Sequence, residues 1–289
     1  MILVKSGRLN LKKFSLLFLM TAALGAAKSQ APGSGQTLAP LPAPRHHFIV
    51  VCHRGDHTHA PENTLAAFAN AIKAGADYVE IDLRTTVDSQ LVIMHDATVN
   101  RMTTGTGLIK DMRYDSLSKL RVKDKTHPEW GEFPIPLFSQ VLELCKDKMY
   151  IYLDFKNADP GAAYRLIQKY GMEKQVVVYI NAEPQFYGWR RVAPAMPLMV
   201  SLPGSVKDTA SLQRFLDRVH PEILDGDYDQ YTQEMITMAQ RLGYVVLPDI
   251  QGPAEGPALW EQPVQKGINA LQTDHPEDLI AWLTGKLIR

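Results

Sequence analysis

The chain has few cysteines, no long apolar run and no excess of charge of either sign. Only Cys52 and Cys145 are cysteines among its 289 residues, so disulfide bonds cannot be the main source of its stability. Both lie within apolar stretches, where a free thiol commonly packs as a small hydrophobic side chain. We therefore expect two buried, unpaired thiols.

The absence of a charge excess limits the class of partner. Lys and Arg total 31, Asp and Glu also total 31, and the formal net charge is zero. A protein without a basic surplus lacks the broad electrostatic attraction that nucleic-acid binding needs. The sequence therefore indicates a small-molecule ligand rather than a nucleic acid.

An apolar run at residues 14–27 follows Lys12 and Lys13 and precedes small residues. It is shorter than the roughly 20 residues that a membrane-spanning helix takes, and its flanks are typical of a secretory signal peptide. We expect residues 1–29 to be a signal peptide and the mature protein to be periplasmic or secreted, without a stable membrane span. Residues 1–29 hold five basic and no acidic residues, so their removal changes the net charge from zero to −5. An uncleaved N-terminal anchor is the alternative.

Residues 30–46 are rich in Pro, Ala, Gly, Ser and Gln, a composition typical of a flexible linker. The remaining residues, 47–289, are expected to form one domain. Its length suits a (β/α)₈ barrel, which typically takes about 250 residues.

Within 47–289, short apolar segments alternate with segments of helical periodicity. Strands are expected at 48–53, 77–83, 91–96, 150–155, 176–180, 197–202, 243–248 and 269–274. Helices are expected at 64–74, 137–147, 160–170, 184–192, 208–218, 230–242, 256–265 and 276–287. Such alternation predicts an α/β fold with a parallel sheet covered by helices. Length favours a TIM barrel over an open doubly wound sheet. A polar, Gly- and Pro-containing segment at about 97–136 interrupts the alternation and is expected to be an insertion over the active face.

Ionisable side chains gather at or just beyond the C-terminal ends of the early strands, which converge on one face of a parallel barrel. Glu80 and Asp82 are two positions apart on a strand, so their side chains share a face. Asp154 and Lys156 repeat this spacing on a later strand. Three converging carboxylates repel one another, and a hard divalent cation such as Mg²⁺ or Ca²⁺ relieves that repulsion. The alternative is that the acids form buried salt bridges with Arg54 and Lys156.

His53 and His95 also lie at strand ends, and an imidazole can serve as acid or base near neutral pH. Arg54 and Lys156 supply the positive charge that phosphoryl transfer needs on the non-bridging oxygens. A metal, two imidazoles and two cations fit a phosphodiester better than a glycoside, whose hydrolysis needs two uncommitted carboxylates.

The ordered motifs HRG (53–55), PENT (61–64), EIDL (80–83) and HD (95–96) resemble the N-terminal signature of the glycerophosphodiester phosphodiesterase family. Weaker similarity continues through YLDFK (152–156) and QTD (272–274). The resemblance implies a (β/α)₈ barrel with a small insertion after the early strands. It also implies metal-dependent hydrolysis of a glycerophosphodiester to an alcohol and glycerol 3-phosphate.

Residue by residue, the resemblance implies three groups of functional side chains. His53 and His95 would be the catalytic acid/base pair, and Glu80, Asp82 and Asp154 would hold one divalent cation. The substrate phosphate would be positioned by Arg54, Glu62 and Lys156. Asp154 stands where the family often has Glu. The segment 247–249, Leu-Pro-Asp, departs from the aromatic and polar residues usual in the substrate pocket, which leaves the alcohol specificity open.

Two other interpretations use the same residues. One is a phospholipase-D-like or cyclising phosphodiesterase acting on lysolipids, which a broad apolar pocket wall would favour. The other is a barrel that binds phosphoglycerol without turnover. Asp225, Asp227 and Asp229 imitate the start of an EF-hand loop, but Gln230 stands where that loop needs Gly, so we reject this motif. The two further histidines of the first loop, His57 and His59, are expected to be solvated.

Overall fold

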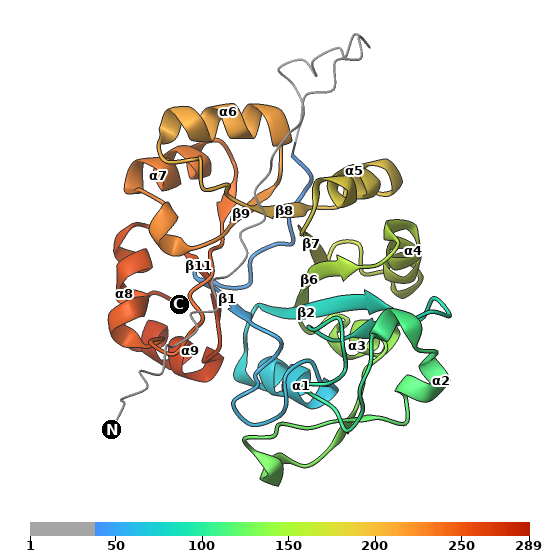
Figure 1. The fold of residues 1–289 in the computed structure, drawn as a ribbon. Helices are drawn as coiled ribbons and strands as arrows, with labels where there is room; N and C mark the ends of the chain where they lie inside the picture. Colours follow the sequence, from blue (N-terminus) through green and yellow to red (C-terminus); the bar gives the residue numbers. More distant parts are fainter. Residues whose placement is uncertain (1–37) are drawn as a thin grey trace, which may run out of the picture.

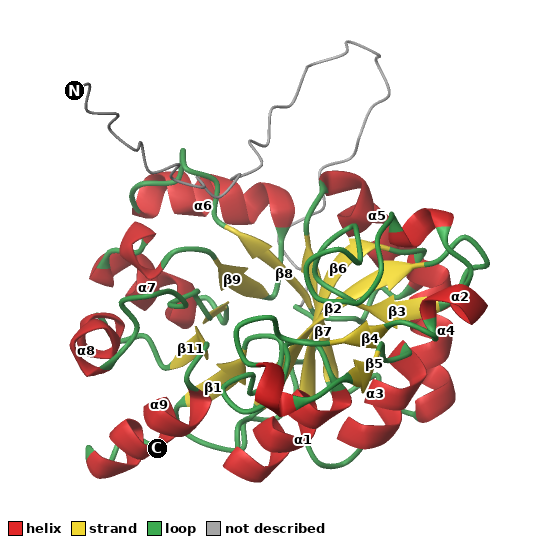
Figure 2. Ribbon diagram, turned by 60° about the horizontal axis from the view of Figure 1, so that its bottom comes forward, coloured by secondary structure: helices red, strands yellow, loops and turns green. Residues whose placement is uncertain are grey.

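The computed structural model describes residues 38–289; the expected signal peptide, 1–29, and the first part of the expected linker lie outside the described residues. Eight parallel strands form a nearly closed barrel, and helices surround it (Figures 1 and 2). The strand order is β10 (Val245–Val246), β9 (Ile223–Asp225), β8 (Leu198–Ser201), β7 (Val176–Ile180), β6 (Tyr150–Asn157), β2 (Tyr78–Thr85), β1 (Ile49–Cys52) and β11 (Ala270–Thr273). A parallel bridge from Asp249, just after β10, to Gln272 of β11 crosses the gap between these two strands. The expected (β/α)₈ barrel is confirmed.

The helices that cover the barrel begin and end at residues with clear local signals. Thr64 caps α1 by accepting a hydrogen bond from the Ala67 N–H at 3.2 Å, and Gly75 ends it with φ 77°. Asp159 caps α4 in the same way, with Pro160 in its first turn. The covering helices are α1 (Leu65–Ala74), α3 (Phe138–Cys145), α4 (Pro160–Tyr170), α5 (Glu183–Val192), α6 (Thr209–Val219), α7 (Gln233–Arg241), α8 (Pro257–Gln265) and α9 (Pro276–Gly285).

Two of the strand predictions need correction. The segment expected at 91–96 forms β3 (Leu91–Ile93), which pairs antiparallel with β2 and lies outside the barrel order. The connection between β2 and β3 is short, and a parallel pair would need a long crossover. The barrel strand that the sequence did not predict is β9, because its three residues are too few to give a recognisable period-two pattern. The strand that carries Asp154 is therefore the third of the barrel in chain order.

Hydrophobic side chains pack on both sides of the barrel wall. The larger cluster lies between strands and helices and includes both cysteines, which are buried and free as expected. A smaller cluster contains one residue from each barrel strand or its immediate end: Val51, Tyr78, Tyr152, Val177, Met199, Ile223, Leu247 and Ala270. These eight side chains fill the part of the barrel interior toward the N-terminal ends of the strands. They form an apolar floor beneath the open end, where the strands have their C-terminal ends.

The described residues before β1 contact the N-terminal end of the barrel. Leu41 packs against the floor cluster, and the Ala43 carbonyl accepts a hydrogen bond from the Tyr150 hydroxyl at 2.7 Å. Asp77, directly before β2, accepts a hydrogen bond from the Val50 N–H at 2.9 Å. It also forms an ion pair with Arg289 at 2.7 Å. Both partners of that ion pair are almost fully buried, so it ties β1, β2 and the C-terminal segment together.

The segment after β3 forms a small unit with its own core. It contains the short helix α2 (Tyr114–Leu117) and a two-stranded hairpin, β4 (Arg121–Val122) with β5 (Phe133–Pro134). Val92 of β3 packs with this unit, and the other buried apolar residues of the cluster are Met94, Val99, Met102, Ile109, Leu117, Val122 and Ile135. This core places the expected insertion beside β2 and β3, at the edge of the barrel.

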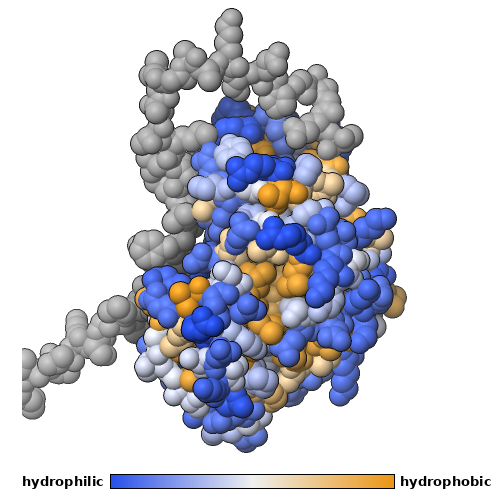
Figure 3. All heavy atoms as spheres, turned by 90° about the vertical axis from the view of Figure 1, so that its right-hand side faces the viewer, coloured by the Kyte–Doolittle hydropathy of each residue, from blue (hydrophilic) through white to orange (hydrophobic). Residues whose placement is uncertain are grey.

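The outer faces of the helices are mostly polar, as amphipathic helices on a buried sheet require. Figure 3 views the side that carries α4 and α5 and shows a largely hydrophilic surface with apolar atoms gathered near its middle. Within residues 38–289, no helix has both the length and the apolarity needed to cross a bilayer.

The Asp77–Arg289 pair gives a stability prediction. Asp77→Ala should lower the free energy of unfolding by about 3 kcal/mol, because Arg289 is left buried without its counter-charge. Urea denaturation followed by circular dichroism measures the change. The matched control is Asp115→Ala, whose side chain is 83% exposed and whose loss should cost no more than about 0.5 kcal/mol. Equal effects of the two substitutions would contradict the assigned role of Asp77.

Candidate active site

The upper half of the barrel interior is polar, and the strand pattern explains why. On each strand, the residues that face inward are two apart. The first of them belongs to the apolar floor, and the next ones carry polar groups. Examples are Tyr78, Glu80 and Asp82 on β2, and Tyr152, Asp154 and Lys156 on β6. Apolar residues near the start of each strand thus support a polar layer near its C-terminal end.

This polar layer lines a cavity of about 430 Å³, a size within the range of small-molecule sites. Seven of the eight predicted site residues line it, and Glu62 does not. The lining residues are His53, Arg54, Glu80, Asp82, His95, Tyr152, Asp154, Lys156, Tyr179, Asn181, Asp225, Asp249, Gln251, Gly252, Gln272 and Asp274. Because most of these side chains are polar or charged, the wall does not have the broad apolar surface that a lysolipid tail would need.

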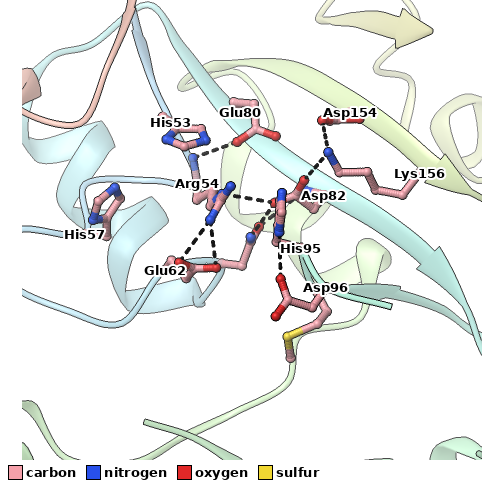
Figure 4. Close-up of polar contacts among 12 residues, drawn as sticks. His53, Arg54, His57, Glu62, Glu80, Asp82, His95, Asp96, Asp154 and Lys156 are labelled. Carbon is pink, nitrogen blue, oxygen red and sulfur yellow. Dashed lines mark hydrogen bonds and ion pairs between the residues drawn. The ribbon is translucent and has the colours of Figure 1, made fainter. Parts of the chain in front are cut away.

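The three predicted metal ligands lie together. Asp82 and Asp154 are direct partners in the register of β2 and β6, and Glu80 precedes Asp82 on the same face. Carboxylate oxygens of the three residues all lie within 4.8 Å of one another, and all three residues are buried. The sequence argument from period-two spacing therefore predicted a cluster that the structure brings to one place (Figure 4).

Burial and the closeness of the three carboxyl groups shift their pKa values. Burial, together with the charges of Asp82 and Asp154, raises the pKa of Glu80 well above its usual range. Burial also raises the pKa of Asp154. It opposes ionisation of Asp82 as well, but Lys156, His95 and Arg54 lower the pKa of that carboxyl. Burial and mutual repulsion thus disfavour ionisation of Glu80 and Asp154, which marks a site where further positive charge is favourable.

Two cations already contact these acids, as the alternative interpretation expected. The Lys156 ammonium lies 3.1 Å from Asp82 Oδ1 and donates to Asp154. The Arg54 guanidinium lies 3.6 Å from Asp82 Oδ2. Yet two cations face three carboxylates, and Asp82 Oδ1 is buried without a hydrogen bond of good geometry. An all-oxygen donor set of three buried carboxyl groups fits a hard divalent cation, so the residues fit the expected metal.

A sharp turn after β1 positions Arg54. Its backbone is in the left-handed region at φ 54°, and its N–H donates to Glu80 Oε2 at 2.7 Å. The next residue, Gly55, has φ 85°, and a Cβ at that position would lie 2.8 Å from the Cβ of Ala67. Only glycine avoids this clash with α1. The tight packing of the turn on α1 explains the Gly of the HRG motif.

The imidazole of His53 is held by a residue from the last strand. Its Nδ1 lies 2.6 Å from Asp274 Oδ1, and His57 Nε2 lies 3.0 Å from the same oxygen. Burial opposes ionisation of Asp274, but the hydrogen bonds from the two histidines lower the pKa of this carboxyl. The hydrogen bond to Asp274 also raises the pKa of His57, against the effect of burial. The expectation that His57 is solvated is therefore wrong.

The imidazole of His95 has a parallel arrangement. Its Nδ1 lies 2.8 Å from Asp96 Oδ1, and Asp96 is in turn bound by Arg101 at 2.9 Å. Burial lowers the pKa of His95, and Arg54 and Lys156 act in the same direction, against the carboxylates of Asp82 and Asp96. The net effect of this environment favours the neutral form of the His95 imidazole.

Glu62 lies behind the cavity wall rather than in it. Its carboxylate is bound by Arg54 at 3.1 Å and by Arg101 at 2.7 Å. Figure 4 shows Glu62 directed to the side of Arg54 that faces away from Glu80. Its observed contacts are with these two arginines, one of which lines the cavity.

Sequence reasoning missed several residues of the cavity. Asp225 belongs to the rejected EF-hand motif, and the sequence predicts no role for Tyr179, Asn181, Gln251 and Asp274. The signal that identifies most of them is the inward period-two pattern, in which an apolar residue is followed two positions later by a polar one. Val177 with Tyr179, Ile223 with Asp225 and Leu247 with Asp249 all fit it.

Comparisons with known proteins agree with the geometry. Residues 53–277 match the model of the glycerophosphoryl diester phosphodiesterase family. A glycerophosphodiester phosphodiesterase of Caldanaerobacter subterraneus subsp. tengcongensis is 29% identical over 248 residues, covering 80% of this chain and 96% of the relative.

Solved structures share the fold. The crystal structure of a glycerophosphodiester phosphodiesterase from Agrobacterium tumefaciens superimposes with a TM-score of 0.72 at 24% identity, over 81% of this chain and 99% of that one. A phosphodiesterase from Oleispira antarctica, in complex with the product sn-glycerol-3-phosphate, gives a TM-score of 0.72 at 22% identity, over 82% and 96% of the two chains. The family match spans both histidines, the carboxylate cluster and the closing Asp274, and the chain therefore belongs to the glycerophosphoryl diester phosphodiesterase family, whose members are hydrolases of phosphodiester bonds.

Proposed function

We propose that the protein hydrolyses glycerophosphodiesters to an alcohol and glycerol 3-phosphate, using one divalent cation, Mg²⁺ or Ca²⁺, and two histidines. One observation carries the proposal: the cavity wall combines a cluster of three buried carboxylates with two imidazoles. A protein that only binds phosphoglycerol gains nothing from two proton carriers beside such a cluster. The polar wall also supports a small water-soluble substrate over a lysolipid.

Both imidazoles are oriented for proton transfer in the same way. Each uses Nδ1 to contact a carboxylate, Asp274 for His53 and Asp96 for His95. This contact fixes the ring and leaves Nε2 as the atom that exchanges a proton with substrate. In the proposed reaction, one Nε2 accepts a proton from the attacking nucleophile, either water or a neighbouring hydroxyl of the substrate, and the other donates a proton to the departing alkoxide. Where the substrate hydroxyl attacks first, water then opens the cyclic phosphate to give glycerol 3-phosphate.

The phosphate would be bound by the positive groups of the wall. Arg54 and Lys156 line the cavity and supply charge for its non-bridging oxygens. A divalent cation held by Glu80, Asp82 and Asp154 supplies further charge when bound. Glu62 orients Arg54 through their ion pair at 3.1 Å, so its proposed contribution to substrate binding is indirect.

The N-terminal sequence adds a proposal on location. Its basic flank, short apolar run and small-residue exit support export to the periplasm or the exterior, with residues 1–29 as the signal peptide. N-terminal sequencing of the protein secreted by an expressing cell would test this proposal, and an intact Met1 would contradict it.

The central experiment is the release of glycerol 3-phosphate from glycerophosphocholine and glycerophosphoglycerol. We expect turnover with Mg²⁺ or Ca²⁺ and loss of turnover in excess chelator, with recovery when the cation is restored. Glycerol 3-phosphate is measured with a coupled dehydrogenase assay. Hydrolysis that survives complete chelation would remove the metal from the proposal, and failure with every cation would remove the activity.

Replacement of either imidazole should abolish most of the activity. His53→Ala and His95→Ala should each lower kcat by about 10²-fold or more, the scale of lost general acid–base catalysis. His59→Ala is the matched control, because that side chain is 65% exposed and should retain normal kcat. Circular dichroism checks the fold of each variant. A kcat near the wild-type value for either cavity variant would exclude that histidine from proton transfer.

Asp274 should act through His53. Asp274→Asn should lower kcat by roughly 10- to 100-fold, the scale of lost second partners of functional histidines, because the ring loses its charged partner. The effect should fall on kcat with KM near its wild-type value, since the carboxylate 2.6 Å from Nδ1 orients the ring. Asp278→Asn, at a side chain 78% exposed, is the control. A kcat near the wild-type value in Asp274→Asn would show that Asp274 has no positioning role.

A further inference from the structure

A second acidic group lies in the cavity wall opposite the carboxylate cluster in the strand order. Asp225 ends β9, and Asp249 follows β10, whereas the metal cluster belongs to β2 and β6. Both aspartates line the same cavity, together with the rings of Tyr152 and Tyr179. None of these four residues has a role in the chemistry described above.

Asp225 is the buried centre of this group. It is 2% exposed, and its Oδ1 atom has no hydrogen-bond partner. Its other oxygen, Oδ2, is 3.2 Å from the Ser201 hydroxyl and 3.5 Å from the Tyr152 hydroxyl. Among residues 38–289, Asp225 forms no ion pair. A buried carboxylate oxygen that faces a cavity without a partner is costly unless a ligand satisfies it.

The surroundings increase the negative character of this wall. Asp249 accepts hydrogen bonds from the side-chain amides of Gln272 at 2.8 Å and Gln251 at 3.2 Å, which hold it beside Asp225. Burial, and after it the charge of Asp249, raises the pKa of Asp225 well above its usual range. An added positive charge would therefore be favourable here, as it is at the carboxylate cluster on the other side.

The chemistry of the wall favours an organic cation over a second metal ion. Among residues 38–289, the groups of three or more potential metal ligands are Glu80, Asp82 and Asp154, and His53, His57 and Asp274; Asp225 and Asp249 belong to neither. The tilted rings of Tyr152 and Tyr179, 5.8 Å apart, instead offer aromatic surface beside the carboxylate. Carboxylate with aromatic rings is the combination that binds ammonium groups.

A neutral polyol fits this wall less well than an amine does. Asp225 Oδ2 already contacts two hydroxyl groups, those of Ser201 and Tyr152, and neither brings a positive charge to the carboxyl. A further hydroxyl from a substrate would add a hydrogen bond but no charge. An ammonium group adds both.

Resting on the proposed hydrolysis of glycerophosphodiesters, we propose that Asp225, with Tyr152 and Tyr179, forms a subsite for a cationic amine on the alcohol part of the substrate. Glycerophosphodiesters of amino alcohols are then the favoured substrate class, and neutral ones of similar size, such as glycerophosphoglycerol, are disfavoured. The subsite determines specificity, and the chemistry stays with the histidines and the carboxylate cluster.

The first test uses the wild-type protein. Choline should inhibit the hydrolysis of glycerophosphoglycerol competitively, whereas 3,3-dimethylbutan-1-ol, its uncharged isostere, should not inhibit at the same concentration. Equal inhibition by both compounds, or by neither, would overturn the proposal.

The second test uses variants and the ratio of kcat/KM for glycerophosphocholine to that for glycerophosphoglycerol. Asp225→Asn should lower this ratio at least about tenfold, since a charge-assisted contact is lost while the shape is kept. Asp249→Asn should lower it in the same direction and serves where Asp225→Asn does not fold. Glu143→Gln, an exposed carboxylate on α3, is the matched control and should leave the ratio unchanged. A ratio unaffected by both aspartate variants would refute the subsite.

Failure of the subsite and failure of the proposed function give different results. If glycerophosphoglycerol is hydrolysed but the ratio does not respond to Asp225, the activity stands and the subsite is wrong. If no glycerophosphodiester is hydrolysed with either cation, the activity is wrong. In that case calorimetric titration of choline into wild-type protein and Asp225→Asn still decides whether the wall binds an amine.

Discussion

The site depends on the repulsion among three buried carboxylates held by the register of two neighbouring strands. Asp82 and Asp154 are direct partners across β2 and β6, and Glu80 lies on the same face. Backbone hydrogen bonds of the barrel fix these positions, so the acids cannot move apart. The neighbouring groups compensate their charge: Lys156 contacts two of them, and the N–H of Arg54 binds the third. A divalent cation would complete that compensation.

The barrel separates stability from chemistry along its axis. Apolar side chains fill the lower interior, and buried contacts such as Asp77 with Arg289 join the strands at that end. Ionisable groups occupy the upper interior, where each is costly to bury. The apolar floor and the surrounding helices stabilise the fold and so offset the free-energy cost of burying the charged layer. Side chains on strands are also held more precisely than side chains on loops, which suits the carboxylate cluster on β2 and β6.

The two histidines lie at different places in the chain but have the same local environment. His53 is oriented by Asp274 from the last strand, and His95 by Asp96, which Arg101 of the insertion holds. The first arrangement requires closure of the barrel between β1 and β11. The second requires the small core of the insertion to hold Arg101 near Glu62 and Asp96. Both the closure of the barrel and the insertion therefore contribute to the geometry of the two imidazoles.

The sequence by itself determined the fold class, the family and most of the carboxylate cluster. Alternating strand and helix patterns indicate a barrel, and two-residue spacing places Glu80 with Asp82 and Asp154 with Lys156, because side-chain alternation on a strand is a local property. Only the tertiary structure decided which residues lie across the cavity from the carboxylate cluster. β9 is too short for a sequence pattern, so Asp225 became part of the cavity only when the barrel closed. Asp274 and His57 likewise meet only because β11 pairs with β1, more than 200 positions away. Contacts between distant strands depend on register and closure, which no local pattern encodes.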